Sequence, residues 1–416
     1  MAEGVIKFGT DGWRGLISDD FTFGNVRVVA QAIADYLNKN RAGKEIKIIV
    51  GYDPRFLSDK FAEAVSEVLA GNGIKVVLSD RPCSTPSLSL VIKEKALAAG
   101  VIVTASHNPA RYNGIKFKAH YAGPAEPAVT KEIESLLHQA PIRQKSFKDA
   151  VKAGSIILEN ILPAYERFLK GYIDFKVLKK AKFNVLMEAM GGASDGSLSR
   201  ILKGTSIRVT TLHEKPDPLF YGVNPEPIEK NLKEASGVIK KGRYDLCIAS
   251  DGDGDRIGAI RPNGVFITPF QLFALLFLHL VEDRKWSGSV VKTVCGTYLI
   301  DNIARHYGVK MHETPVGFKY IASIMLKEEV IIGGEESGGY GFKNYTLERD
   351  GILSGLLILE MMAQRKKSID DLLKDLHRRF GQSSYLRVDM ECPEEVKGAL
   401  WKNLRISRHL SSPAKR

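Results

Sequence analysis

Cysteine is scarce in this chain of 416 residues, and its four cysteines form no close pair and no cluster with histidine at metal-ligand spacing. We expect free thiols in a reducing compartment, at Cys83, Cys247, Cys295 and Cys392. The first ten residues lack the basic stretch and apolar core of a secretory signal. The most apolar run, residues 270–281, is too short to span a bilayer and contains His279. These absences disfavour a membrane or secreted protein and favour the cytoplasm.

A strong one-signed charge pattern is also missing, although the formal net charge is +12. A basic excess can reflect nucleic acid, acidic lipid or an anionic substrate. Half of this excess lies in residues 365–416, which hold thirteen Lys/Arg and seven Asp/Glu. No basic stripe with interleaved aromatic residues and no nucleic-acid motif is present. We therefore expect neither a nucleic acid nor a membrane as partner.

The length and the hydrophobic pattern predict an α/β protein of several domains, because one core rarely serves more than about 250–300 residues. Apolar, β-branched runs alternate with helical patterns such as Asp59–Leu69. This order predicts parallel βαβ units. The strand candidates are Ile46–Asp53, Lys75–Asp80, Gly100–Ser106, Phe183–Met190, Ile207–Leu212, Leu246–Ser250, Ser289–Val294, Lys310–Thr314 and Val330–Gly333. Domain boundaries are expected near residues 139–145, 261–264 and 381–384.

In each third of the chain, the last buried strand leads into a polar loop rich in Gly or Asn. The three loops read TASHNP, SDGDGDR and GGEESGG. Open α/β sheets bind ligands beyond the carboxyl ends of their strands. Three such loops from three similar units are therefore expected to line one central cleft.

The first loop carries a candidate nucleophile, Ser106, followed by His107. Adjacent residues need not face each other, so no Ser-His-Asp triad follows from this pair. From the residues alone, a turn with a capping serine and a nucleophilic serine are equally good interpretations. Lys116, ten residues after the serine, is a candidate proton donor, proton acceptor or phosphate contact.

The second loop, Asp251-Gly-Asp-Gly-Asp-Arg256, is the most specific of the three. Carboxylates at alternate positions, separated by glycines, can converge on a hard divalent cation. An EF-hand would need Gly at position six and Glu at position twelve, where this chain has Arg256 and Pro262. Three carboxylates suit Mg²⁺ completed by a phosphate oxygen, and a solvated acidic turn is the alternative.

The third loop offers carboxylate and hydroxyl groups that could bind sugar hydroxyls, although taken alone it is better explained as a plain glycine-rich turn. The scattered cations Arg14, Lys292 and Lys319 are, taken singly, better explained as surface charges.

Together these segments resemble the α-D-phosphohexomutases, the phosphoglucomutase/phosphomannomutase group. FGTDGWRG (residues 8–15), TASHNP, DGDGDR and GGEESGG occur in the order and spacing of that family, and the resemblance covers residues 6 to about 380. It implies three similar mixed-sheet α/β domains around a central cleft, at residues 1–140, 141–262 and 263–380. Residues 381–416 would be an incomplete fourth domain.

The resemblance also implies roles for individual residues and a reaction. Ser106 would be the phosphoserine, and one of its oxygens would complete an Mg²⁺ site made by Asp251, Asp253 and Asp255. The reacting phosphoryl group would be surrounded by Arg14, His107, Lys116 and Arg256, and Lys116 would transfer the proton. The substrate would be contacted by Glu335, Ser337, Lys292 and Lys319. The implied reaction interconverts hexose 1-phosphate and hexose 6-phosphate through a bound 1,6-bisphosphate, with glucose or mannose as the sugar.

One departure from the family concerns the C-terminal region. The family's fourth domain carries an Arg-x-Ser-Gly-Thr loop that binds the non-reacting phosphate, and no such sequence follows Ser383-Ser384 here. The chain is therefore expected to bind substrate weakly and to turn over slowly. A phosphoglucosamine mutase and a weakly active, truncated sugar-phosphate-binding subunit are the alternatives. The sequence does not indicate the oligomeric state.

Overall fold

The computed structural model describes residues 6–9, 11–41, 43–194, 196–385, 388, 392, 396 and 398. The chain divides into two units, Met1–Gln382 and Ser383–Arg416. All helices and strands with assigned bounds belong to the first unit. Most of the predicted fourth-domain remnant, residues 381–416, lies outside the described residues, so it stays a prediction.

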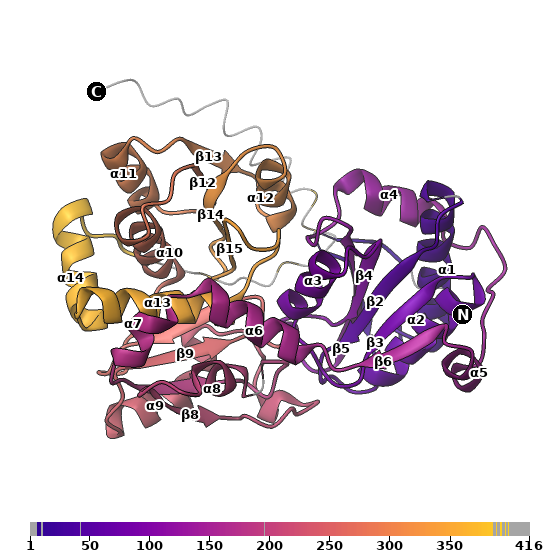
Figure 1. Cartoon of the computed structure of the whole chain (residues 1–416), viewed down its shortest axis with the longest axis horizontal. Helices are drawn as coiled ribbons and strands as arrows, with labels where there is room; N and C mark the ends of the chain where they lie inside the picture. The colour runs from indigo at the N-terminus through magenta and orange to yellow at the C-terminus, as the bar shows by residue number, and fades with distance from the viewer. Residues whose placement is uncertain are drawn as a thin grey trace. The chain divides into compact units, whose positions relative to one another are not determined.

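The first of three sheets in the described residues is built from β1 (Trp13–Leu16), β2 (Lys47–Tyr52), β3 (Lys75–Ser79), β4 (Ala99–Val103), β5 (Tyr112–Ala119) and β6 (Ile156–Glu159). Their spatial order is β1-β5-β4-β2-β3-β6. β2, β3, β4 and β6 are parallel, whereas β5 is antiparallel to both β4 and β1. The accompanying helices are α1 (Phe23–Asn40), α2 (Ser58–Gly71), α3 (Thr85–Glu94), α4 (Pro127–Ser135) and α5 (Phe147–Lys152) (Figure 1).

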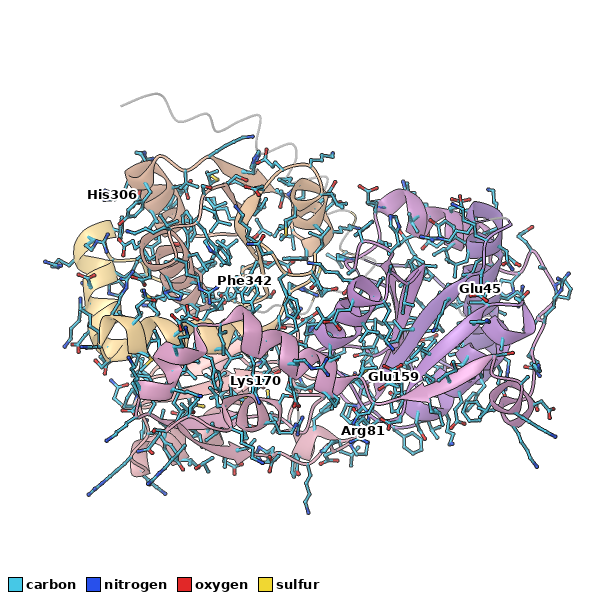
Figure 2. All side chains as sticks on the ribbon, viewed as in Figure 1. Glu45, Arg81, Glu159, Lys170, His306 and Phe342 are labelled. Atoms are coloured by element: carbon cyan, nitrogen blue, oxygen red, sulfur yellow. The ribbon has the colours of Figure 1, made fainter. Side chains whose placement is uncertain are left out.

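This sheet continues beyond the boundary predicted at residues 139–145. β6 pairs with β3, and Ile156 is buried in the first core. The preceding segment runs along α2, where Lys145 donates its backbone N–H to the carbonyl of Glu67. Glu159, labelled in Figure 2 at the end of β6, pairs with Lys95 after α3. A polar, proline-containing stretch therefore joins two parts of one layer here, although its composition resembles that of a linker.

The second sheet contains β7 (Asn184–Glu188), β8 (Arg208–Leu212), β9 (Leu246–Ser250), β10 (Ile257–Ile260) and β11 (Phe266–Ile267), in the spatial order β11-β10-β9-β7-β8. β7, β8 and β9 are parallel, and β10 is antiparallel to both neighbours. Its helical segments are α6 (Leu162–Tyr172), α7 (Phe175–Lys180), α8 (Ser197–Leu202), η1 (Phe220–Gly222), η2 (Glu229–Asn231) and α9 (Lys233–Lys241).

The third sheet contains β12 (Ser289–Thr293), β13 (Met311–Thr314), β14 (Val330–Gly334) and β15 (Tyr340–Phe342), in the order β13-β12-β14-β15. β15 is antiparallel to β14, and the other pairs are parallel. Phe342, labelled in Figure 2, is buried in the core that the second and third sheets share. The helical segments are α10 (Pro269–Leu278), η3 (His279–Asp283), α11 (Tyr298–Tyr307), α12 (Phe318–Met325), α13 (Gly351–Arg365) and α14 (Ile369–Phe380).

The apolar run at residues 270–281 forms a core helix. It begins at a capping box, in which Thr268 and Gln271 bind each other's backbone N–H groups. The helix is apolar on all sides because α11, α13 and α14 pack around it. None of the helices within the described residues combines the length and apolar character that a bilayer crossing requires.

Each of the three sheets contains the same type of strand connection, and this connection positions its polar loop. In each sheet three parallel strands follow one another along the chain, and the third of them (β4, β9 or β14) is followed directly by an antiparallel strand (β5, β10 or β15). The loops between them are residues 104–111, 251–256 and 335–339. The predicted strands are confirmed, but the antiparallel strands that follow each loop were not predicted. Each loop therefore turns at the carboxyl end of its sheet, where ligands bind in open α/β folds.

Candidate active site

Ser106 lies in a strained turn after β4 and faces the aspartate loop. Its side chain is buried and its φ is 55°, a left-handed value that is uncommon for a residue other than glycine. The Thr104 hydroxyl oxygen accepts the Ser106 N–H at 2.8 Å, and the Ser106 hydroxyl lies 3.2 Å from Asp251 Oδ2. Because the loop leads into β5, this serine does not cap a helix, which favours the nucleophile interpretation.

The aspartate loop brings its three carboxylates together, as their alternate spacing predicts. Asp251, Asp253 and Asp255 are fully buried, and one oxygen from each lies within 4.8 Å of the others. Within the described residues, the Oδ1 atoms of Asp253 and Asp255 have no hydrogen-bond partner. Buried carboxylate oxygens without partners are costly unless a ligand satisfies them. Three converging carboxylates with unpaired oxygens fit a hard cation such as Mg²⁺.

The pKa values of two aspartates in this loop are shifted in opposite directions, and repulsion by the other aspartates contributes to the shift of Asp251. Burial, reinforced by the charges of Asp255 and Asp253, raises the pKa of Asp251 well above its usual value. Burial also raises the pKa of Asp253, but the Lys116 ammonium outweighs burial and holds it well below the usual value. A divalent cation would relieve the same repulsion.

Lys116 lies within the carboxylate cluster. It projects from β5, is buried, and its Nζ lies 2.7 Å from Asp253 Oδ2, 3.4 Å from Asp255 Oδ2 and 3.0 Å from Asp11 Oδ2. Burial lowers the pKa of Lys116, but the three carboxylates outweigh burial and raise it. The protonated ammonium can donate a proton or bind an anion, but it cannot accept a proton.

A second set of buried charges, which the sequence analysis missed, joins the aspartate loop to the third loop. Arg349 Nη1 lies 2.6 Å from Glu335 Oε2, and its Nη2 contacts Asp255 and Asp11. Lys118 Nζ lies 2.6 Å from Glu348 Oε2 and 3.1 Å from Asp11 Oδ1. Lys118 follows Lys116 by two positions, so both side chains lie on one face of β5. The alternate spacing of these two lysines was the feature of the sequence that could have indicated this second set of charges.

These loops surround a small polar cavity of about 150 Å³. Four cations line it together with His107: Arg14, Arg256, Lys319 and Arg349. Its hydroxyl and carboxylate groups come from Asp11, Glu335, Glu336 and Ser337. Such a lining suits a phosphorylated, polyhydroxylated ligand, because cations bind phosphate and carboxylates accept hydrogen bonds from hydroxyl groups.

Arg14 of β1 and Arg256 of the aspartate loop each contact a residue close to the serine. Arg14 Nη1 donates to Asn108 Oδ1 at 2.8 Å, and the backbone N–H of Arg256 donates to Asp251 Oδ1 at 3.0 Å. His107 Nδ1 lies 3.4 Å from the Ser106 hydroxyl. Burial, with help from the charges of Arg256 and Arg14, lowers the pKa of His107 well below its usual value, so its imidazole is neutral.

Lys292 is a predicted site residue that the structure shows in ion pairs of the third domain. Its Nζ is 2.7 Å from Asp301 Oδ2 and 3.3 Å from Glu313 Oε2, and its side chain is buried. It is absent from the described lining of the cavity, whereas Lys319 is part of it. The structure therefore shows an ion-pairing role for Lys292 within the third domain, and its contact with substrate stays a prediction.

Comparison with known proteins identifies the same three α/β domains. Models of phosphoglucomutase/phosphomannomutase alpha/beta/alpha domains I, II and III match residues 5–143, 163–264 and 268–380. A phosphoglucomutase/phosphomannomutase of Thermococcus kodakarensis is 30% identical over 376 residues, which cover 90% of this chain and 80% of that protein. A phosphoglucosamine/phosphogalactosamine mutase of Sulfurisphaera tokodaii is 29% identical over 377 residues, covering 90% of this chain and 81% of that protein.

A solved structure shows the same fold. The crystal structure of a Thermus thermophilus protein described as a phosphomannomutase is 38% identical and superposes with a TM-score of 0.87. The match covers 94% of this chain and 88% of that one. Three domain matches in order, together with relatives that cover most of the chain, show that this protein belongs to the α-D-phosphohexomutase family, the phosphoglucomutase/phosphomannomutase group.

Proposed function

We propose that this protein interconverts hexose 1-phosphate and hexose 6-phosphate, with glucose or mannose as the sugar and Ser106 as the phosphoryl carrier. The observation that carries the proposal is the position of the Ser106 hydroxyl. It lies 3.2 Å from a cluster of three buried aspartates, beside a cavity lined by four cations. Phosphoryl transfer depends on such positioning and on the stabilisation of charge.

In the proposed cycle, phosphorylated Ser106 gives its phosphoryl group to the free hydroxyl of a bound hexose monophosphate. The bond from phosphorus to the serine oxygen breaks and a bond from phosphorus to the sugar oxygen forms. The released serine oxygen takes up a proton from Lys116, and the proton of the sugar hydroxyl replaces it on Lys116. The resulting 1,6-bisphosphate reorients, and its other phosphoryl group returns to Ser106 with the opposite proton movement. Arg14 and Arg256 would hold the phosphoryl oxygens, and Lys116 would donate the proton.

Asp251, Asp253 and Asp255 would hold Mg²⁺ together with an oxygen of the phosphorylated Ser106. Bound there, the ion would neutralise charge on the transferring group. Glu335 and Ser337 would bind sugar hydroxyls. Glu335 is held by Arg349, which is also bound to Asp255, so the sugar loop and the metal loop are fixed relative to each other.

The test is phosphorylation of Ser106 by glucose 1,6-bisphosphate, followed by peptide mass spectrometry. We expect one phosphate on the peptide that contains Ser106 and none in the Ser106→Ala protein. Ser89→Ala is the matched control, because Ser89 is a buried serine of the same domain on α3, away from the loop. Phosphate found only on other peptides would refute the assignment.

An amino sugar is the second candidate substrate, and Glu336 is the observation in its favour. Glu335 is neutralised by Arg349, whereas within the described part of the chain Glu336 has only the Thr293 hydroxyl as partner, at 2.7 Å. A carboxylate without a cation at the cavity could attract the ammonium of glucosamine phosphate. The test measures kcat/KM for glucosamine phosphate and for glucose phosphate on the wild type and on Glu336→Gln. The variant should lose activity on glucosamine phosphate and keep its activity on glucose phosphate. The slow turnover expected from the missing Arg-x-Ser-Gly-Thr loop stays a prediction, and the same kinetic measurements test it.

A further inference from the structure

One buried arginine holds the serine loop and has no part in the proposed transfer steps. Arg55 follows β2, and its side chain is fully buried in an ion pair with the equally buried Asp53, whose Oδ2 lies 3.0 Å from Arg55 Nε. Phe220 of the second domain covers the guanidinium, with its ring centroid 4.7 Å from Cζ. A guanidinium in such a place must use its N–H groups within the protein, since it has no access to water.

All five N–H groups of Arg55 are used. Besides the bond from Nε to Asp53, the two terminal nitrogens donate to four backbone carbonyl oxygens of the serine loop and the start of β5. These belong to Ser106 at 2.6 Å, Asn108 at 2.7 Å, Pro109 at 2.9 Å and Tyr112 at 2.9 Å. Only the planar fork of arginine can satisfy four acceptors and a carboxylate at once.

The Asp53–Arg55 pair thereby fixes both backbone polar groups of Ser106. Arg55 binds its carbonyl oxygen, and the Thr104 hydroxyl accepts its N–H at 2.8 Å. The same hydroxyl donates to Asp53 Oδ2 at 2.5 Å. A serine at φ 55° persists only where its surroundings impose that conformation, and these bonds do so.

We infer that Arg55 is the positioning residue of the phosphoryl carrier: it holds the Ser106 backbone in the left-handed conformation that directs the hydroxyl at the aspartate cluster. This inference rests on the proposed function for the identity of the carrier. Arg55 itself is sealed beneath the loop and contacts neither the cavity nor the three aspartates within the described contacts. Its effect on the reaction is therefore indirect.

The test compares Arg55→Lys with Arg284→Lys. Arg284 is a matched control, because it is also largely buried, pairs with Glu360 and donates to a backbone carbonyl, that of Tyr172. It belongs to the third domain, away from the serine loop. Two quantities are measured on each intact protein: the single-turnover rate of phosphoryl transfer from glucose 1,6-bisphosphate to Ser106, and hydrogen exchange of the amides of residues 104–112.

An ammonium can make at most three of the five hydrogen bonds, so the loop should loosen in Arg55→Lys. We expect transfer roughly 100-fold slower, because a displacement of about 1 Å at the reacting group has that effect. Bisphosphate affinity should change by less than about threefold, since binding groups are untouched. Exchange should accelerate in residues 104–112. Arg284→Lys should lower the unfolding temperature and leave the rate and the loop exchange unchanged.

A folded Arg55→Lys protein with wild-type transfer rate and wild-type loop exchange would overturn the inference. If the wild-type protein takes up no phosphate on Ser106, the proposed function fails, while loop exchange still tests the positioning role. If Arg55→Lys does not fold, Thr104→Val decides, since it removes the link between Asp53 and the Ser106 N–H without changing charge. Faster exchange at residues 104–112 in that variant supports the inference, and unchanged exchange rejects it.

Discussion

Gly252 is the position at which the closeness of the serine and aspartate loops can be tested most directly. A Cβ at this residue would lie 2.6 Å from the carbonyl oxygen of Ser106 and 3.2 Å from Cγ of Pro225. The backbone of Gly252 is fixed on both sides, because its N–H donates to the Pro225 carbonyl at 3.1 Å and its carbonyl accepts the Ala193 N–H at 2.9 Å. Gly252→Ala should therefore push the serine loop away.

The magnitude follows from the distances. Ordinary van der Waals contact begins at 3.4 Å, so the Cβ and the oxygen must separate from 2.6 to 3.4 Å, a shift of about 0.8 Å. Misplacement of a reacting group by about 1 Å slows a reaction by about 100-fold. We expect phosphoryl transfer between Ser106 and substrate to slow by roughly 30- to 100-fold, or about 2–2.7 kcal/mol of activation free energy. Overpacking should also cost about 1–3 kcal/mol of stability.

The assay is single-turnover transfer from glucose 1,6-bisphosphate, with unfolding by urea measured in parallel. Gly237→Ala in α9 is the control, because a Cβ there meets no atom within 4 Å. Alanine in a helix interior is favoured over glycine by roughly 1 kcal/mol, so this variant should be at least as stable as the wild type and fully active. A folded Gly252→Ala protein that transfers phosphate as fast as this control would show that the two loops need not approach as the structure has them.

Three further predictions concern the buried charges. Asp253→Asn removes a proposed ligand, so its Mg²⁺ affinity should be at least about tenfold lower in a metal titration. Activity of the wild type that persists in excess chelator would contradict the proposed metal site. Lys118→Met removes the 2.6 Å partner of the buried Glu348 and one of the three cations beside Asp11, and should cost about 3 kcal/mol in urea unfolding. An unchanged midpoint would argue against these ion pairs. Burial raises the pKa of Glu360, but hydrogen bonds from His279 and Arg284 outweigh it and hold the pKa at about 2. A lowered pKa stabilises the folded state by roughly 3 kcal/mol above the ordinary pKa of 4.5, and this contribution is lost as the pH falls toward 2. Glu360→Gln should therefore lose less stability between pH 5 and pH 3 than the wild type. Equal losses in the two proteins would refute the argument.

Several parts of the site were predictable because their signals are local. The alternation of Asp251, Asp253 and Asp255 with glycines places three carboxylates on one curled loop whatever surrounds it. The position of Ser106 at the end of a buried strand follows from the apolar run before it. The structure brings these two loops together, since each follows the third in a row of parallel strands, β4 or β9, at the carboxyl end of its sheet.

Other parts could not be predicted because their signal is misleading outside the fold. Lys116 and Lys118 alternate with apolar residues on β5, and a lysine on alternate strand positions normally indicates a solvent-facing side. Both are buried here because Asp11, Asp253 and Glu348, which are far apart in the sequence, supply the opposite charges. Arg349 was missed for the same reason. Lys292 was expected at the substrate; the structure shows it in ion pairs with Asp301 and Glu313, and its contact with substrate stays a prediction.

The sequence by itself determined the three parallel strands before each polar loop, the three loops at the carboxyl ends of strands, and the residue types that suit a metal and a phosphoryl carrier. These features depend on hydrophobic periodicity and on groups a few residues apart. Only the tertiary structure decided that the strand after each loop is antiparallel, that β6 joins the first sheet, and that Arg55 and Arg349 tie the loops in place. Ion pairs and hydrogen bonds between residues distant in the chain depend on burial, and burial exists only once the sheets have packed.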